Sequence, residues 1–482
     1  MAPTLPLPPL QRLQNLASRT FDPGATADSF REEWSNPSNY AFTILLLIGG
    51  DLIHRALAQL VGGPIAPVAF SFGWVSYATS AVCSALGEYR LMPDADTGCS
   101  LINGKNGYVR GNNSWVLGRM MRDYDYWMHP AIREKTQNLI DARWKFDQAR
   151  EDEKYPDSGI KVPRPSQAGL VVSVYKPSKT LQAGVPGKDL LYWSGILCTV
   201  LQLGIASIPA GINGDWGVLM ITGAATVLCY GTGALTQWKV EKWACRRLDN
   251  RNKKNFVLTR GNGAQHAIAI VSDGVGLDLE DLATGFSMID YPTITVVAQL
   301  LTIVLGIAWV ALLITASGID TGSWYLIAVG GIGMLQNIFV AGWKRTPAAY
   351  GVPLEFVEVV GEVKVMGTLM ELERRYEKLG KSLLGTFFPG DLRDNEVKQW
   401  EEIKEEWKRK KERGEGAGDD RKGKSCLIIS FPPSDFCESG SDGLVPFEYL
   451  VMVVELHDQS DVPESDRNSF LAIFRYQAVM QV

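Results

Sequence analysis

Apolar and polar stretches alternate along this chain on the scale of whole membrane spans. Four runs, at 64–87, 190–212, 216–238 and 294–318, carry almost no charge, and a fifth at 323–343 is nearly as apolar. Each is longer than the roughly 18 residues that distinguish a membrane helix from a core helix. The pattern therefore predicts at least five helices that cross a bilayer.

A sixth candidate, AFTILLLIGGDLIHRALAQL at 41–60, is apolar except for Asp51, His54 and Arg55. Short turns at 62–64, 213–215 and 317–320 would join the six runs in pairs. The predicted fold class is an α-helical multi-pass membrane protein with about six transmembrane helices in three short-turn hairpins, and with small mixed α/β cytosolic segments.

The predicted organisation alternates membrane and cytosolic segments. It comprises a cytosolic N-terminal tail (1–39), membrane hairpin 1 (40–87), a cytosolic loop domain (88–188), membrane hairpin 2 (189–238), a cytosolic basic loop with a β-hairpin (239–291), membrane hairpin 3 (292–343), a cytosolic helical tail (344–413), and a linker with a strand-rich appendix (414–482).

The distribution of basic residues predicts the orientation of the spans. The three short turns contain no Lys or Arg, whereas basic residues follow the fourth run and the last run directly. Because basic residues near span ends stay on the cytosolic side, both termini are predicted to be cytosolic, in a membrane that the sequence does not name. Trp216 with Trp238, and Trp324 with Trp343, are predicted to mark the two membrane interfaces. The basic residues are Lys239, Lys242, Arg246, Arg247, Arg251, Lys253 and Lys254 after the fourth run, and Lys344 and Arg345 after the last.

The ionisable residues of the opening stretch form the first candidate site. In a helix, Asp51 and Arg55 are four positions apart, and His54 lies one turn from Asp51. Because a charge at the bilayer centre costs about 2.5–3.5 kcal/mol on insertion scales, such residues must be paired or buried. Three alternatives stay open. The residues line a pathway for ions or protons, or they form an internal ion pair that fixes helix register, or the segment lies in the interface and never crosses, which leaves five spans and moves the amino terminus outside.

The last apolar run adds Gln336 and Asn337 beside Gly330, Gly331 and Gly333. Small residues let helices approach closely, so helix packing is the simpler interpretation of this group. A polar pathway lined by the two amides is the alternative.

The polar segments contain local signals of helices and strands. Asn113 or Ser114 predicts a helix start, and Pro130 opens a second helix. GLVVSVY at 169–175 predicts a strand, and FVLTRGNGAQHAIAIV at 256–271 predicts a β-hairpin around a Gly-Asn-Gly turn. Thr368 with Glu371 forms a capping box, which predicts a helix that ends at Gly380.

In the tail, an apolar stripe of Val397, Trp400, Ile403 and Trp407 runs along a highly charged helix. The face around Trp400 and Trp407 is a candidate docking face for a protein partner, and the lipid bilayer is the other predicted partner. GDDRKGKS at 418–425 matches the phosphate-loop pattern, but a strand pattern follows it where a helix is required. We therefore interpret this match as a coincidence.

Composition argues against several function classes. Lys and Arg number 48 against 53 Asp and Glu, which gives a net charge of −5, so no nucleic-acid partner is predicted. The seven cysteines lack CxxC spacing and the four histidines lie far apart, so no disulfide framework, metal site or cofactor is predicted. Because no nucleophile or acid–base set is recognisable, we expect the protein not to be an enzyme.

Five segments carry a resemblance to a known group of proteins: FGWVSYA at 72–78, LINGKNGYVRGNNSWVLGRMMRDYDYWM at 101–128, VLTRGNGAQH at 257–266, LDLEDLA at 277–283 and AVGGIGMLQNIFVAG at 328–342. Together they resemble a family of uncharacterised multi-pass membrane proteins of filamentous fungi, over about residues 39–393. The resemblance implies membrane residence and no particular activity, so no catalytic residue is transferred. The final sixty or so residues do not resemble the family.

The function predicted from these patterns is that of a membrane organiser or binding module. The alternative is a transporter or channel for a small solute or ion, which would use Asp51, His54, Arg55, Gln336 and Asn337.

Overall fold

The computed structural model describes residues 49–87, 90–155, 161–249, 253–286, 292–319, 322–413, 426–430 and 451–455. The chain divides into two compact units, Met1–Lys404 and Glu405–Val482. In the second unit, β7 (Cys426–Ser430) pairs antiparallel with β8 (Val451–Glu455). The predicted N-terminal tail, the run AFTILLLI and the GDDRKGKS motif lie outside the described residues.

The apolar runs at 190–212, 216–238, 294–318 and 323–343 lie mainly in five helices of the first unit: α9 (Leu190–Asn213), α10 (Gly217–Gly233), α11 (Thr236–Lys242), α13 (Pro292–Ala316) and α14 (Ser323–Gly342). Three helices of the described part are long and apolar enough to cross a membrane, namely α9, the Val296–Ala316 part of α13, and α14. α10 and α11 make a fourth only if this pair, bent by 40°, forms a single span. The prediction of about six transmembrane helices is therefore wrong.

In the described part of the first two predicted spans, both helices are too short to cross a bilayer. α4 (Gly50–Leu60) has 11 residues and α5 (Gly73–Gly87) has 15. At 1.5 Å per residue they measure roughly 16 and 22 Å, which is less than the roughly 30 Å of hydrocarbon that a span must cross. Residues 61–72, which we call the strap, are not helical. Pro64 and Pro67 interrupt a helix here because proline lacks the main-chain N–H that a helix needs.

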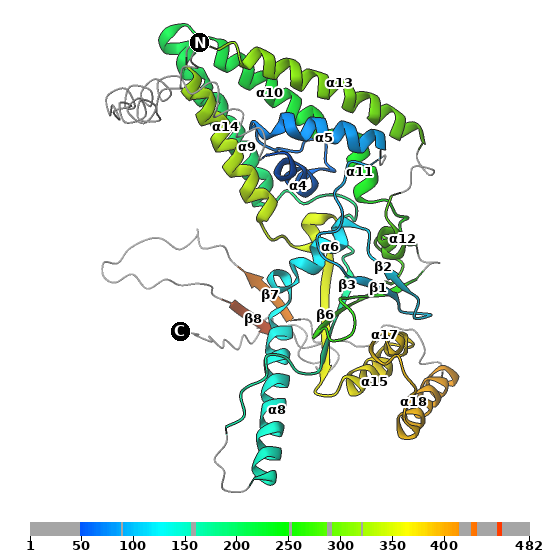
Figure 1. Ribbon diagram of the computed structural model, residues 1–482. Coiled ribbons are helices and arrows are strands. Elements are labelled where there is room, and N and C mark those ends of the chain that lie inside the picture. Colours follow the sequence, from blue (N-terminus) through cyan, green and yellow to red (C-terminus); the bar gives the residue numbers. More distant parts are fainter. Residues whose placement is uncertain are drawn as a thin grey trace, which may run out of the picture. The chain divides into compact units, whose positions relative to one another are not determined.

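The strap and its two flanking helices lie among the long apolar helices (Figure 1). α9 packs against α14, and α10 packs against both α9 and α13. Inside this arrangement α4 contacts α14 and α5, and α5 contacts α13. The segment predicted to form the first membrane hairpin is thus enclosed by the other apolar helices.

A six-stranded sheet forms the polar part of the same unit, in the strand order β2-β1-β4-β5-β3-β6 (Figure 1). The β3–β5 pair is parallel, and the other four pairs are antiparallel. The strands come from all three polar segments that separate or follow the apolar helices, so the sheet joins these segments into one body. Their bounds are β1 (Ser100–Asn103), β2 (Val109–Gly111), β3 (Leu170–Pro177), β4 (Asn255–Thr259), β5 (His266–Val271) and β6 (Leu354–Glu362).

Alternating side chains give the sheet two apolar faces. Leu101 and Phe256 belong to a large core cluster that also contains residues of the apolar helices. Their neighbours Ile102 and Val257 point the other way, into a second cluster, as the two-residue period of a strand requires. The helices on the polar part are α6 (Trp115–Arg122), α7 (Tyr124–Trp127), α8 (Pro130–Lys154), α12 (Leu279–Thr284), η2, a 3-10 helix (Pro347–Tyr350), α15 (Val365–Arg375), α16 (Leu379–Ser382), α17 (Leu384–Phe387) and α18 (Asp394–Glu412).

Two local predictions about helix ends have different outcomes. α8 begins at Pro130, as predicted, and the Nδ1 atom of His129 accepts a hydrogen bond from the main-chain N–H of Ala131 (3.3 Å). The predicted capping box is wrong. Thr368 lies inside α15, where its hydroxyl donates to the carbonyl oxygen of Leu170 (3.1 Å), and the helix ends at Arg375.

Candidate functional site

The strap places main-chain carbonyl groups between the apolar helices, and amide side chains of those helices donate hydrogen bonds to them. Gln202 on α9 donates from Nε2 to the carbonyl oxygen of Phe70 (2.7 Å) and to that of Val329 on α14 (2.8 Å). Asn337 on α14 donates from Nδ2 to the carbonyl oxygen of Ala69 (3.0 Å). Because an unpaired polar group in apolar surroundings costs about 2–7 kcal/mol, these amides allow a non-helical chain to lie there.

Glycines let the flanking helices touch the main chain of the strap. A Cβ atom at Gly333 of α14 would lie 1.7 Å from the carbonyl oxygen of Phe70. A Cβ atom at Gly195 of α9 would lie 2.0 Å from the carbonyl oxygen of Pro67. Real Cβ contacts are never this short, so any larger residue at either position would displace the strap.

Two acceptor atoms beside the strap have no hydrogen-bond partner in the described part of the chain. They are Oε1 of Gln202 and Oδ1 of Asn337, and both side chains are fully buried. The Nε1 donor of Trp309 is likewise unpartnered, on a ring that stacks against Phe70 and Trp74. Irregular backbone with unfilled acceptors between helices is typical of places where water, ions or substrates bind in membrane proteins.

The charged residues of α4 lie apart from this site. Arg55 Nε and Asp51 Oδ2 form an ion pair of 2.9 Å, and the two side chains are 52% and 73% exposed. Burial raises the pKa of Asp96, in the loop between α5 and β1, and of the two charges Arg55 lowers this pKa and Asp51 raises it. His54 Nε2 lies 2.7 Å from the carbonyl oxygen of Leu91. Of the three alternatives for this segment, the one that never crosses fits this exposure and the short helix.

The two amides predicted on α14 have different partners. Asn337 faces the strap and also reaches the Ser71 hydroxyl (3.3 Å), whereas Gln336 donates to the Ser194 hydroxyl on α9 (2.8 Å). No hydrogen bond or ion pair of the described residues joins either amide to the charged residues of α4. The five predicted candidates therefore do not form one site.

A buried network of charges joins the apolar helices to the sheet. Arg345, whose side chain is 1% exposed, binds both carboxylate oxygens of Asp189, the N-cap of α9 (2.7 and 3.0 Å). Its Nη1 atom donates to the carbonyl oxygen of Gln59 near the end of α4 (2.6 Å). Its main-chain N–H donates to Asp123, which also accepts from the Tyr350 hydroxyl (3.1 and 2.7 Å). One residue thus connects α4, α9 and the segment that leads into β6.

α11 holds both ends of the segment that contains the strap. Lys242 donates to three carbonyl groups at the end of α4. Glu241, the residue before it, accepts hydrogen bonds from the main-chain N–H groups of Leu91 and Met92, which follow α5 (2.6 to 2.9 Å). A lysine side chain thus binds carbonyl groups at the entry of the segment, and a glutamate side chain binds N–H groups at its exit.

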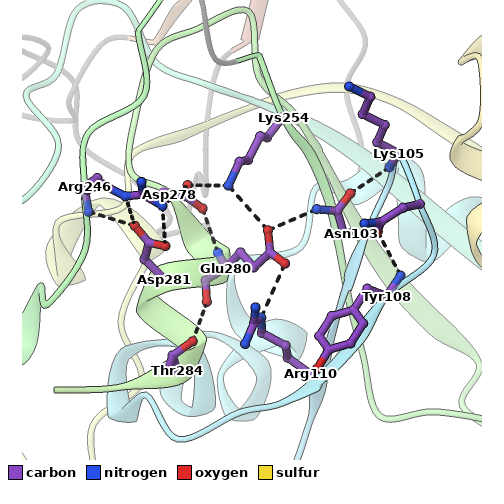
Figure 2. Close-up of polar contacts among 11 residues, drawn as sticks. Asn103, Lys105, Tyr108, Arg110, Arg246, Lys254, Asp278, Glu280, Asp281 and Thr284 are labelled. Atoms are coloured by element: carbon purple, nitrogen blue, oxygen red, sulfur yellow. Dashed lines mark hydrogen bonds and ion pairs between the residues drawn. The ribbon is translucent and has the colours of Figure 1, made fainter. Parts of the chain in front are cut away.

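A second polar network, on the sheet, fastens α12 (Figure 2). Lys254 Nζ donates to Oδ2 of Asp278, the N-cap of α12 (2.6 Å), and lies 3.4 Å from Glu280. Arg246 binds both carboxylate oxygens of Asp281 (2.6 and 2.9 Å), and this hydrogen bonding lowers the pKa of the Asp281 carboxyl. Two members of the predicted basic loop are therefore paired with acidic residues of the same chain.

Of the residues that contact the strap, Asn337 and Gly333 stand out in the sequence, whereas Gln202 and Gly195 are not predicted. Gln202 is the only amide in its apolar run, which is a usable signal, since a lone amide in such a run needs a polar partner. Lys242 and Arg345 were counted as basic anchors that face the cytosol, yet both are buried. Trp238, predicted at a membrane interface, is also fully buried and donates to the carbonyl oxygen of Thr232 (3.1 Å).

The predicted docking stripe on α18 is partly covered by the chain itself. Ile403 is buried, and Trp400 packs against the second apolar cluster of the sheet. A protein partner at this helix stays a prediction. Among the described residues no group of three or more His, Cys, Asp or Glu could hold a metal ion.

Comparison with known proteins identifies no relative of this chain. No protein-family model, no curated protein and no solved structure matches the chain. The resemblance to the fungal membrane family gains no support from these comparisons and stays a prediction.

Proposed function

We propose that this chain is an integral membrane protein whose apolar helices anchor a folded α/β body, and that it acts as a membrane organiser or binding module. The Arg345 network carries this proposal. The buried guanidinium of Arg345 binds the N-cap of α9 and a carbonyl group near the end of α4, and its main-chain N–H binds Asp123 between α6 and α7. A body attached so firmly to its anchor is suited to present a fixed surface at the membrane. Transport by sliding or rocking of large parts needs looser attachments.

The exposure of the long helices supports membrane residence. Leu197 on α9 and Ile307 on α13 are 69% and 66% exposed, and large apolar side chains at such exposure favour lipid as their surroundings. We further propose that α9, α13, α14 and the bent α10–α11 pair all cross, so that both termini and the sheet lie on the cytosolic side. The turns at 213–216 and 317–322 would then lie on the opposite side, and neither contains Lys or Arg.

Three experiments test this function. The protein should stay in the membrane pellet after alkaline carbonate extraction, and a tag on the carboxyl end should be reachable only in opened cells. Reconstituted vesicles should show no more ion or small-solute flux than empty vesicles. Flux above that background would contradict the organiser function. If this flux is lost in a Gln202→Leu and Asn337→Leu double variant that still folds, the protein is a transporter.

Transport is the second candidate, and the strap supports it. A helix, an extended segment and a second helix enclosed by apolar helices form the kind of broken element that binds solutes in transporters. The unpartnered oxygens of Gln202 and Asn337 are the groups that would bind. The exposed Asp51–Arg55 pair does not belong to this binding site, so replacing both residues by Leu should leave any flux unchanged.

A further inference from the structure

The ammonium group of Lys242 occupies a cage of carbonyl groups at the end of α4. Its Nζ atom donates hydrogen bonds to the carbonyl oxygens of Ala58 (2.9 Å), Gln59 (3.2 Å) and Val61 (2.8 Å). An ammonium group has three N–H donors, so each donor has one acceptor. The residue is 1% exposed, so water contributes little to this arrangement.

Aromatic rings complete the cage in place of a counter-ion. Nζ lies 5.6 Å from the ring centre of Trp115 and 5.5 Å from that of Trp243. No carboxylate of the described residues lies within 4.0 Å of Nζ. The carbonyl dipoles at a helix C-terminus and two ring faces stabilise the charge, and the Asp189–Arg345 pair acts on it from beyond contact distance, the two charges in opposite directions. Carbonyl oxygens that replace water around a cation are also how proteins bind dehydrated monovalent ions.

We propose that the end of α4 is a binding site for a primary ammonium ion, which the native chain fills with its own Lys242. If the side chain is shortened, a free alkylammonium ion of the missing length occupies the cage and restores the attachment of α4 to α11. Three carbonyl groups each accept one N–H of the ammonium group, the one of Gln59 being shared with Arg345, and this arrangement selects a primary ammonium ion. A quaternary ammonium ion offers no N–H, and K⁺ offers charge without directed donors.

The test compares Lys242→Ala with a control on the same helix. Alanine lacks the three carbon atoms of lysine beyond Cβ and the ammonium group. n-Propylammonium supplies these three carbon atoms and an ammonium group. The full chain in detergent is melted with n-propylammonium, tetramethylammonium or potassium chloride at equal ionic strength. We expect K242A to melt several degrees below the native chain, and n-propylammonium alone to recover at least half of the loss. Lys239→Ala, at an exposed position of α11, should show neither the loss nor the recovery.

Three results would overturn the proposal: recovery by tetramethylammonium or K⁺ equal to that by n-propylammonium, an equal gain in K239A, or no recovery at all. A second variant keeps the test decisive if K242A does not fold. Lys242→Gln retains N–H donors without the charge, and it should melt below the native chain and gain nothing from n-propylammonium because its side chain fills the cage. A K242Q chain as stable as the native one would show that the site does not require an ammonium ion.

Discussion

At the scale of single residues, the strap is stable among apolar helices because side-chain amides donate the hydrogen bonds that water would otherwise supply. Gln202 is the clearest case, since one nitrogen atom serves carbonyl groups on two different segments, Phe70 of the strap and Val329 of α14. Its loss would affect both segments at once. The amide therefore fixes the strap relative to α9 and α14 together.

We expect Gln202→Leu to lower the free energy of unfolding by about 1–3 kcal/mol, because it leaves the carbonyl group of Phe70 buried and unpaired, whereas that of Val329 keeps its bond within α14. The melting temperature in detergent measures this loss. Ser207→Ala is the control on the same helix, because the Ser207 hydroxyl is exposed and bonds only to its own helix, at Gly204. Equal melting temperatures of the two variants would mean that the strap does not depend on Gln202.

We expect Gly333→Ala to destabilise the protein by about 1–3 kcal/mol, because the added methyl group would overlap the carbonyl oxygen of Phe70 and force the strap to move. Gly331→Ala is the matched control two positions away, where a Cβ atom meets nothing within 4 Å. Both variants remove one glycine from α14 and gain the same helix propensity. The difference in melting temperature between the two variants measures the effect of the contact with the strap. Identical melting curves would contradict this contact.

Sequence reasoning located some of these residues and missed others for a physical reason. Asn337 was predicted as a polar candidate because an amide in an apolar run is unusual. Its partner on the strap could not be found, because the partner is a main-chain carbonyl group, which every residue has. Lys242 and Arg345 look like interfacial anchors in the sequence, since local pattern does not show which basic side chains turn inward.

At the scale of elements, α12 shows how a short helix is held by charges around it. It has six residues, too few for a helix to be stable alone, and its attachment depends on Lys254 and Arg246. The N-cap and first-turn carboxylates of α12 are the groups that these bases bind (Figure 2). The helix therefore depends on carboxylates that can be protonated.

We expect the native chain to lose stability as pH falls below about 4, relative to an Asp281→Asn variant. Arg246 lowers the pKa of Asp281 in the folded chain. The ion pair therefore contributes its full stability above the pKa that Asp281 has in the unfolded chain, and this stability is lost as pH falls through the pKa in the folded chain. Melting temperatures of both chains between neutral pH and about pH 3 measure the difference. The gap between them should narrow toward acid pH, and a constant gap would exclude this titration.

The apolar runs predicted helices well but predicted their surroundings badly. Residues 64–87 are as apolar as a membrane span, yet they form the strap and a helix of 15 residues that other helices enclose. A segment can be apolar because it faces lipid or because it is buried inside protein, and composition is the same in both cases. Pro64 and Pro67 are the signal that a continuous helix does not form there.

At the scale of the whole molecule, the chain divides into two units, and the first contains every apolar helix and the six-stranded sheet. We expect a chain that ends after Arg413 to keep the melting temperature of the full chain in detergent, because both core clusters lie within the residues it retains. Size-exclusion chromatography with thermal melting checks this. A large fall in melting temperature would mean that the first unit needs the second.

The individual strands β3, β4 and β5 are visible in the sequence, but the sheet is not. Pairing β3 with β5 in parallel and with β6 antiparallel joins residues on either side of the apolar helices. Local periodicity carries no information about such distant partners. The three polar segments that supply these strands thus form one sheet, which local patterns along the sequence do not reveal.

The position of β6 sets the order in which this body can be completed during synthesis. β3 ends before α9 begins, and its antiparallel neighbour β6 leaves the ribosome only after α14. In the topology proposed above, the nascent chain until then exposes an open strand edge to the cytosol while its apolar helices enter the membrane. Such unpaired edges promote aggregation, so biogenesis of this protein should depend on chaperones that shield β3 until translation ends.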